Sequence, residues 1–264
     1  MGCAESRPGK DPRKTALRPI DLITAEKLKD MLNKVCILDC STEEKDGKTA
    51  KQQFDECHIS GALFFDTANC RDADSGLPNT LPVQEKFIEH MKALGVGLDK
   101  PVVCYDNSKN QWASRAAFLL RAYGHRNVFV FAGGVSFWNM KKESAAGQYP
   151  TVQTDENAVL KGDGEFFNYE LDESQLIRYE ELLATCEKGD YQIIDARPQG
   201  FDAGHVTNAI NVPMGNFIYG SPSLFKKPDE VKAALVAAGV NPSKPIVVSC
   251  GSGIGASVVL VACH

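Results

Sequence analysis

Short apolar runs alternate with amphipathic segments along most of the chain. The apolar runs have the length of buried strands and cover residues 37–39, 101–105, 128–131, 193–195 and 245–249. Helices are predicted between them, over residues 24–33, 85–94, 174–187 and 229–238. Strands that alternate with helices in this way favour an α/β fold with a largely parallel sheet.

This pattern occurs twice, so the chain contains an internal repeat. Three pairs of segments correspond in the same order, at offsets of 156, 147 and 144 residues: 37–39 with 193–195, 58–62 with 205–209, and 94–103 with 238–247. The falling offset places extra residues in the first copy between Asp39 and His58, where the polar, Lys-rich stretch 43–53 predicts a loop. Shared order with different loop lengths indicates a duplicated domain.

The two copies are predicted to end differently. We divide the chain into a flexible leader (1–19), a first domain (20–149), a linker (150–172) and a second domain (173–264). The first domain continues through the strand 128–131 to Gly133, Gly134 and Trp138, whereas only 14 residues follow Cys250. The second domain is therefore expected to be shortened at its C-terminal side, which would expose backbone groups and apolar surface of its sheet.

Composition and charge exclude several classes of protein. The chain is 43% hydrophobic and has a net charge of −5 without a basic stripe, so it has enough apolar content for a core and does not resemble a nucleic-acid-binding protein. No apolar stretch approaches the roughly 18 residues of a membrane span. The nine cysteines include no Cys-x-x-Cys pair, which predicts reduced thiols in the cytoplasm or the mitochondrion and argues against disulfides or a metal site.

The first residues fit three interpretations. Met1 to Ser6 match the N-myristoylation pattern, with Cys3 available for a second acyl chain, and nearby basic residues would support membrane contact. A mitochondrial presequence is a second interpretation, although Glu5 and Asp11 count against it. We favour a disordered polar leader, so membrane contact is expected only if the leader is acylated.

The strand that ends at Ser249 runs directly into a glycine-rich loop that begins at Cys250. Parallel α/β sheets bind their ligands at the carboxyl ends of strands. Gly251, Gly253 and Gly255 allow successive backbone N–H groups to converge on one point, and the helix predicted to follow adds positive potential at its N-terminus. Such a loop stabilises a thiolate, a persulfide or an anionic substrate.

Four interpretations of this loop compete. A cysteine phosphatase needs an Arg at the sixth position after the Cys, where Ala256 stands. A dinucleotide-binding loop needs an acidic residue about 20 positions further on, beyond His264. Sulfur transfer through a cysteine persulfide needs only the thiolate and its amide cradle. A buried cysteine in a tight glycine-rich turn needs no function at all.

The duplicated organisation and the sequence Cys250-Gly251-Ser252-Gly253 resemble the tandem-rhodanese sulfurtransferases. The other segments that carry the resemblance are His58–Asp66, Tyr123-Gly124-His125, Gly133-Gly134 with Trp138, and Asp195-Ala196-Arg197. The resemblance implies two rhodanese-like domains, each a mainly parallel sheet flanked by helices. It also implies that the first domain is catalytically silent, because Asp106 occupies the position that matches Cys250.

The same resemblance implies a reaction and its residues. Cys250 would take a sulfur atom from 3-mercaptopyruvate, or less well from thiosulfate, and pass it as a persulfide to cyanide or a thiol such as thioredoxin or glutathione. Ser252 is the second predicted catalytic residue, and it favours mercaptopyruvate because the loop has no cationic side chain for thiosulfate. The predicted substrate-binding residues are Arg197, Gly251, Gly253, Ile254 and Gly255. For Arg197 the alternative is a structural ion pair, and no metal or other cofactor is implied.

The sequence departs from the family pattern in three places. The loop continues Ile254 to Ser257 as Ile-Gly-Ala-Ser instead of Val-Thr-Ala-Cys, and the second substrate arginine of the family has no match. The Asp and His that some family members carry in the first domain align with Ala68 and Asn79. These departures and the shortened second domain support an alternative function, a catalytically weakened sulfur-carrier or regulatory module.

Several other conspicuous residues are predicted to be structural. Asp195 and His205 recur in the first copy as Asp39 and His58, so we predict that they shape turns and take no part in catalysis. Trp138 is predicted to pack in the core or at the domain interface.

Overall fold

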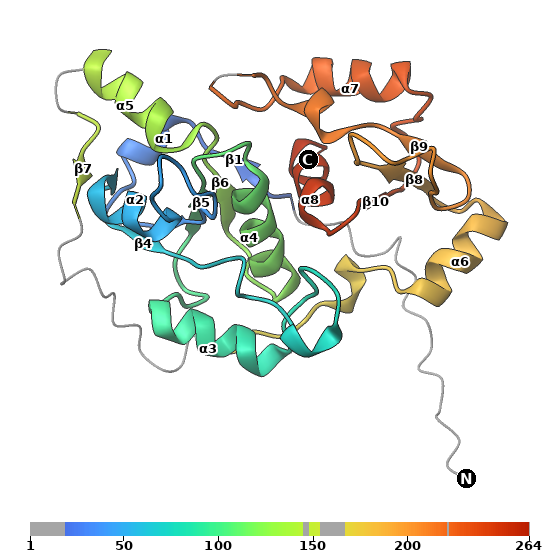
Figure 1. Cartoon of the computed structure of the whole chain (residues 1–264), viewed down its shortest axis with the longest axis horizontal. Coiled ribbons are helices and arrows are strands. Elements are labelled where there is room, and N and C mark those ends of the chain that lie inside the picture. Colours follow the sequence, from blue (N-terminus) through green and yellow to red (C-terminus); the bar gives the residue numbers. More distant parts are fainter. Residues whose placement is uncertain (1–18, 145–147, 154–166, 221, 264) are drawn as a thin grey trace, which may run out of the picture.

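The computed structural model describes residues 19–144, 148–153, 167–220 and 222–263. The first copy contains a five-stranded sheet in which all paired strands are parallel (Figure 1). In spatial order the strands are β1 (Asp21–Leu22), β6 (Val128–Val130), β5 (Val102–Tyr105), β2 (Cys36–Asp39) and β4 (Ala62–Phe64). The strands β2 and β5 in the middle are buried along their whole length, as their apolar sequences predict.

Helices cover both faces of this sheet because successive strand residues point to opposite sides. On one side lie α3 (Gln84–Leu94) and α4 (Gln111–Ala122), and on the other lie α1 (Ala25–Lys29), α2 (Ala50–Glu56) and α5 (Gly134–Ser144). Leu38 belongs to the core beneath α3 and α4, whereas its neighbour Ile37 belongs to the core on the opposite face. Trp138 is fully buried in that second core, as predicted.

One segment that we predict to be a loop contains a helix instead. The prediction for residues 43–53 is wrong in its last part, because α2 begins at Ala50. Thr49 and Gln52 form a capping box, in which each side chain accepts a hydrogen bond from the backbone N–H of the other. Phe54, one turn further on, is buried and anchors this short helix in the core.

The two histidines that recur in the repeat make the same local contacts. The ring of His58 stacks on Phe54, with centroids 3.9 Å apart, and its Nδ1 lies 2.8 Å from the carbonyl oxygen of Phe54. His205 repeats both contacts with Phe201, at 3.7 Å and 2.9 Å. These contacts within one turn of chain support the structural role predicted for both histidines.

The second copy has a smaller sheet of three parallel strands. Its order is β10 (Ile246–Ser249), β8 (Gln192–Asp195) and β9 (Ala209–Asn211). The helices of this copy are α6 (Tyr179–Lys188), α7 (Pro228–Ala237), α8 (Ile254–Ala262) and the 3-10 helix η5 (Met214–Phe217). The remaining described elements lie before α6 in the chain. They are two short 3-10 helices, η2 (Ala73–Ser75) and η4 (Glu173–Gln175), and an antiparallel pair of strands, β3 (His58–Ile59) and β7 (Thr151–Val152).

The strand that carries the glycine-rich loop lies at the edge of its sheet. In the first copy, β5 lies between β2 and β6 and is buried, whereas within the described residues its counterpart β10 pairs only with β8. All four residues of β10 are half-buried. Within the described residues, β10 is therefore an edge strand of its sheet.

The helix α8 joins the two copies. Val258 and Val261 pack in the same core as α4 of the first copy, whereas Val259 packs in the core of the second copy. Figure 1 shows α8 between α4 and the second sheet. Because α8 begins directly after the Cys250 loop, this packing fixes the loop against the first copy.

Two sequence predictions fall mainly outside the described part of the chain. The leader, with its candidate acylation sites, lies in residues 1–18, and the middle of the predicted linker lies in residues 154–166. Among the helices in the described ranges, none has the length and apolar character needed to cross a bilayer.

Candidate active site around Cys250

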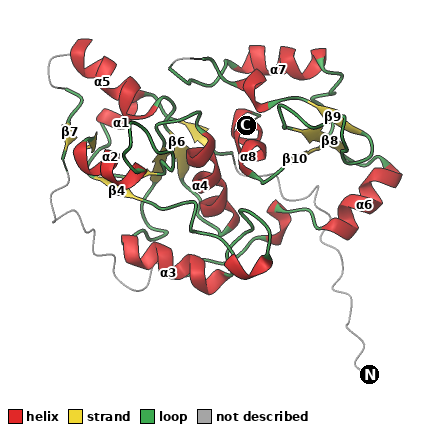
Figure 2. Cartoon of the chain, in the orientation of Figure 1, coloured by secondary structure: helices red, strands yellow, loops and turns green. Residues whose placement is uncertain are grey.

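Cys250 lies directly after the carboxyl end of β10, before α8 begins. Figure 2 shows the positions of β10 and α8. The strand ends at Ser249 and the helix begins at Ile254, so four residues make the connection. Cys250 is half-buried. This is the edge at which parallel sheets bind ligands, and the sulfur also faces the positive end of a helix dipole.

One backbone donor of the loop is directed at the sulfur. The N–H of Gly253 donates a hydrogen bond to Cys250 Sγ, with the nitrogen 3.0 Å from the sulfur. Gly253 has a φ of +77°, a left-handed conformation that residues with a Cβ rarely adopt. Its carbonyl oxygen accepts a hydrogen bond from Ser257 Oγ at 2.8 Å, which ties the turn to the first turn of α8. The glycine thus fixes a turn that presents an N–H to the thiol.

Arg197 lies beside this loop but is already engaged in an ion pair. Its Nε and Nη2 donate to the carboxylate of Asp195 at 2.7–3.0 Å, and Nη2 also donates to the carbonyl oxygen of Gly204 at 2.7 Å. Burial favours a higher pKa for Asp195, but the hydrogen bonds from Arg197 outweigh it and hold that pKa below its usual value. The ion pair that we consider as the alternative for Arg197 is therefore present, and its role in substrate binding stays a prediction.

The other residues predicted for the site lie around Cys250, and among the described residues none of them forms a hydrogen bond with its sulfur. A Cβ atom on Gly251 would lie 3.9 Å from the Arg197 side chain, so this glycine brings the loop close to the arginine. Ile254 is buried, and a Cβ atom on Gly255 would lie 3.3 Å from Met214 Sδ. The Ser252 hydroxyl has no hydrogen bond to any residue that the structure describes, so its catalytic role stays a prediction.

A residue of the first copy completes the surroundings of the loop, and our sequence analysis does not identify it. Arg115, in α4, is 5% exposed, and its Nη1 lies 3.4 Å from where a Cβ atom on Gly253 would be. Burial lowers the pKa of Arg115 to about 10, against the effect of Cys70 and Cys250, so the guanidinium stays positive at neutral pH. The sequence signal is weak, because Arg115 is one of two arginines within an otherwise largely apolar helical stretch.

The matching loop of the first copy holds a carboxylate in place of the thiol. Asp106 is fully buried, and Oδ1 accepts hydrogen bonds from the N–H and hydroxyl of Ser108 and from the N–H of Asn110. Oδ2 accepts from the N–H groups of Trp112 and Ala113, at 2.9 and 2.8 Å. Burial raises the pKa of Asp106, and these donors oppose the rise. In the first loop the carboxyl group of Asp106 therefore accepts the hydrogen bonds of the surrounding donors.

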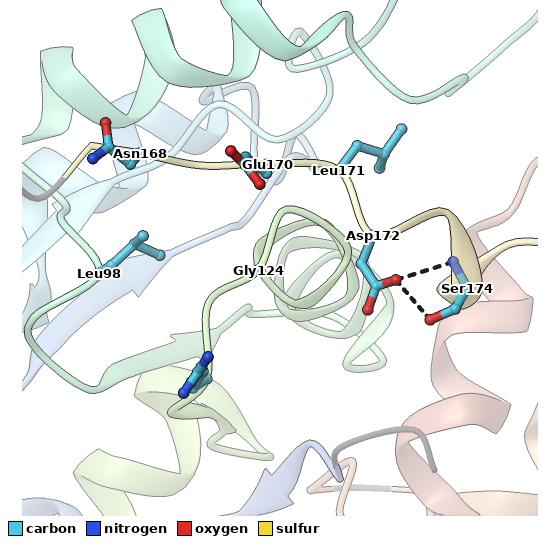
Figure 3. Close-up of a pocket in the computed structure, with 8 residues that line it drawn as sticks. Leu98, Gly124, Asn168, Glu170, Leu171, Asp172 and Ser174 are labelled. Carbon is cyan, nitrogen blue, oxygen red and sulfur yellow. Dashed lines mark hydrogen bonds between the residues drawn. The ribbon is translucent and has the colours of Figure 1, made fainter. Parts of the chain in front are cut away.

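A separate pocket of about 700 Å³ opens beyond the C-terminal end of α4. Its lining residues are Leu98, Gly124, Arg126, Asn168, Glu170, Leu171, Asp172 and Ser174 (Figure 3). The carboxylate of Asp172 faces Ser174 and accepts hydrogen bonds from its N–H and hydroxyl. All predicted site residues lie in the described part of the chain, and none of them lines this pocket.

Comparisons with known proteins agree with the geometry. The sequence model of a family described as the rhodanese-like domain matches residues 24–141 and 178–263. The chain is 34% identical over 230 residues to 3-mercaptopyruvate sulfurtransferase from Escherichia coli (strain K12), covering 83% of this chain and 78% of that protein. It is 30% identical over 243 residues to thiosulfate sulfurtransferase from Cricetulus griseus, covering 86% and 78%.

A solved structure extends the likeness to the whole fold. The crystal structure of the 3-mercaptopyruvate sulfotransferase SseA from Escherichia coli superposes with a TM-score of 0.79 at 32% identity. The match covers 92% of this chain and 93% of that one.

Proposed function

Since the chain belongs to the rhodanese-like family and is a sulfurtransferase, we propose that it moves sulfur from 3-mercaptopyruvate to a thiol through a persulfide on Cys250. The observation that carries the proposal is the position of Cys250 Sγ, at the carboxyl end of a parallel strand and 3.0 Å from the N–H of Gly253. This setting stabilises an anionic sulfur, which is the nucleophilic form.

In the first half of the proposed reaction, the Cys250 thiolate attacks the sulfur of 3-mercaptopyruvate. A sulfur–sulfur bond forms, the carbon–sulfur bond of the donor breaks, and its electron pair stays on carbon as the enolate of pyruvate. A proton from solvent or from the Ser252 hydroxyl converts this enolate to pyruvate. Cys250 then carries one additional sulfur atom, and backbone N–H groups of the loop would stabilise its charge.

In the second half, an acceptor thiolate attacks the outer sulfur of the persulfide. The bond between the two sulfur atoms breaks, its electron pair returns to Cys250 as the thiolate, and the acceptor leaves as a persulfide. Cyanide would react in the same way and leave as thiocyanate. Thioredoxin and glutathione are the acceptors that we propose. The described cysteines are all free thiols, which supports a reducing compartment such as the cytoplasm or the mitochondrion.

The composition of the loop supports mercaptopyruvate as the preferred donor. Gly251 and Ser252 bring no cationic side chain into the loop itself, and the thiosulfate dianion would gain more from such a charge than mercaptopyruvate with its single carboxylate. Arg197, near Gly251, is the residue that we propose for the single carboxylate of mercaptopyruvate. To bind it, the guanidinium would present the edge that does not face Asp195.

Intact-mass spectrometry tests the proposal directly. The purified chain and Cys250→Ser are exposed separately to 3-mercaptopyruvate and to thiosulfate. We expect the wild type to gain the mass of one sulfur atom, more completely with mercaptopyruvate, and the variant to gain none. A well-folded wild type that gains no sulfur from either donor would refute the proposed function.

The edge position of β10 among the described residues favours a second candidate, a sulfur carrier with weak turnover. The strand beside Cys250 is half-buried, whereas β5 in the first copy is enclosed by strands on both sides. Turnover separates the two candidates. An enzyme releases many pyruvate molecules per chain with excess glutathione, whereas a carrier releases one and then stops.

A further inference from the structure

Arg115 is a buried cation beside the Cys250 loop, and the proposed mechanism assigns it no role. It extends from α4 of the first copy to the turn at Gly253 in the second. Gly253 is the residue whose N–H donates to Cys250 Sγ. A side chain of the copy without the nucleophile therefore lies against the turn that holds the nucleophile.

The protein partners of Arg115 do not neutralise its charge. Its Nη2 donates to the backbone carbonyl oxygen of Asn79, and its Cζ lies 5.6 Å from the centroid of the Phe118 ring. Within the described ranges of the chain, no carboxylate forms an ion pair with it. Burying a cation without an anionic partner is costly, so an anion is expected nearby.

Three groups that can become anionic act on Arg115: Cys70, Tyr123 and Cys250. Burial raises the pKa of Cys70 to about 12 and that of Tyr123 to about 12, so both are neutral at physiological pH. Cys250 is half-buried and lies at the N-terminus of α8, where an anion is stabilised. Cys250 is therefore the group that can supply the missing negative charge.

Arg197, the second cation near the loop, does not supply a positive charge to Cys250, because it is paired with a carboxylate. Arg197 lies on the side of the loop formed by β8, and its charge is neutralised by Asp195 at 2.7 Å. The 3-10 helix η5 contributes the uncharged Met214 at Gly255. Of the charged groups that face Cys250 from these elements, Arg115 alone has no carboxylate partner among the described residues.

We infer that Arg115 is a positioning residue for the reaction of Cys250, which holds the Gly253 turn from the first copy and supplies the positive charge that stabilises the anionic sulfur. The role rests on the proposed function of Cys250 as the nucleophile. It assigns the first copy a direct contribution to the chemistry of the second.

Alkylation of the full-length chain with iodoacetamide tests this role without a sulfur donor. The rate is measured on the peptide that contains Cys250, as a function of pH, for wild type, Arg115→Met and Arg115→Lys. The matched control is Arg121→Met, which removes another buried arginine of α4 that donates to the carbonyl oxygens of His125 and Arg126. Circular dichroism in the near ultraviolet verifies the fold of each variant.

We expect Arg115→Met to lower the rate at neutral pH about tenfold and to move the pH profile about one unit towards alkaline pH. Arg115→Lys is expected to restore most of the rate, and Arg121→Met to leave the profile in place. Coincident profiles for Arg115→Met and wild type would overturn the inference, as would an equal shift in folded Arg121→Met. If Arg115→Met does not fold, Arg115→Gln takes its place in the comparison with Arg115→Lys.

The experiment also separates this inference from the proposed function. Alkylation that depends on Arg115 in a chain that gains no sulfur from mercaptopyruvate would refute the proposed function alone. Sulfur loading that is normal in Arg115→Met, with an unchanged pH profile, would refute the role of Arg115 alone.

Discussion

The loops that follow β5 and β10 hold different groups at the same place in the fold. In the first, the Asp106 carboxylate accepts five hydrogen bonds from the loop and from the first turn of α4. In the second, Cys250 Sγ accepts one, from Gly253. The two oxygens of the carboxylate accept from five donors, whereas the single sulfur accepts from one. The donors alone therefore do not make a site reactive.

The turns that shape the two loops are also alike. The residue before α4 is Asn110, with φ +58°, and the residue before α8 is Gly253, with φ +77°. Asn110 lies four positions after Asp106, whereas Gly253 lies three positions after Cys250. In both loops the N–H of this left-handed residue donates to the side chain that begins the loop, Asn110 to Asp106 Oδ1 at 3.1 Å and Gly253 to Cys250 Sγ at 3.0 Å.

The largest expected effect comes from giving the second loop the anion of the first. Cys250→Asp is expected to reduce pyruvate release from 3-mercaptopyruvate to the uncatalysed background, because the carboxylate takes up the donors and cannot form a persulfide. Steady-state pyruvate assays measure this. Cys263→Ser removes an exposed thiol at the other end of α8 and should retain activity. Residual turnover in Cys250→Asp would place the nucleophile elsewhere.

The next effect is on stability, in the first loop. Asp106→Asn replaces one acceptor oxygen with an amide that faces N–H groups, and we expect a loss of about 4 kcal/mol in the free energy of unfolding. Urea unfolding measures the loss, and Asp74→Asn, an exposed change in the same copy, should cost almost nothing. Equal stabilities for both variants would show that the five hydrogen bonds do not stabilise the fold.

The pH dependence of stability offers a third test, specific to the first copy. Burial lowers the pKa of His125 to about 4, so this 1% exposed side chain is neutral in the fold. In the unfolded chain a histidine binds its proton near pH 6.5. The contribution of the buried neutral His125 to the free energy of unfolding is therefore complete above that pH and is lost as the pH falls towards 4. We expect a loss of about 3 kcal/mol over this range in wild type relative to His125→Gln. Parallel stability curves for the two proteins would contradict the expected neutral histidine.

The smallest expected effect concerns the turn before α8. Gly253→Ala forces a Cβ atom into a left-handed conformation, against Arg115 Nη1, and is expected to cost about 1 kcal/mol in unfolding free energy. Gly215→Ala, in η5, has a normal φ and open space around the new Cβ, so it serves as the control. A cost no larger than that of Gly215→Ala would mean that this left-handed position accepts a residue with a Cβ atom, as the matching position of the first loop accepts Asn110.

The sequence predicts most of the fold because the repeated segments have unambiguous patterns. The apolar runs that end at Asp39 and Asp195 become β2 and β8. Each of these strands pairs with a neighbour on both sides, β2 with β5 and β4, and β8 with β10 and β9. The helix α2 is missed because its signal is a capping box of two polar residues in a Lys-rich stretch, where hydrophobic spacing says little.

The site is predicted only as far as it is local in sequence. Cys250 and its glycines are consecutive, so the loop is recognisable without a structure. Arg115 approaches Gly253 through the packing of α4 against α8, a contact between distant segments that no spacing rule encodes. Arg197 and Asp195 are two positions apart, so an ion pair between them could be considered from the sequence. Only the structure shows that the pair forms.

The packing of α8 against both cores has a consequence for how amino-acid changes in this chain are interpreted. Val258 and Val261 pack the helix that follows Cys250 against the neighbouring copy, so a change on the facing side of α4 is expected to alter the surroundings of Cys250 without any change in the second copy. We therefore expect variants on the face of α4 that contacts α8 to alter the reactivity of Cys250, although they lie in the other copy.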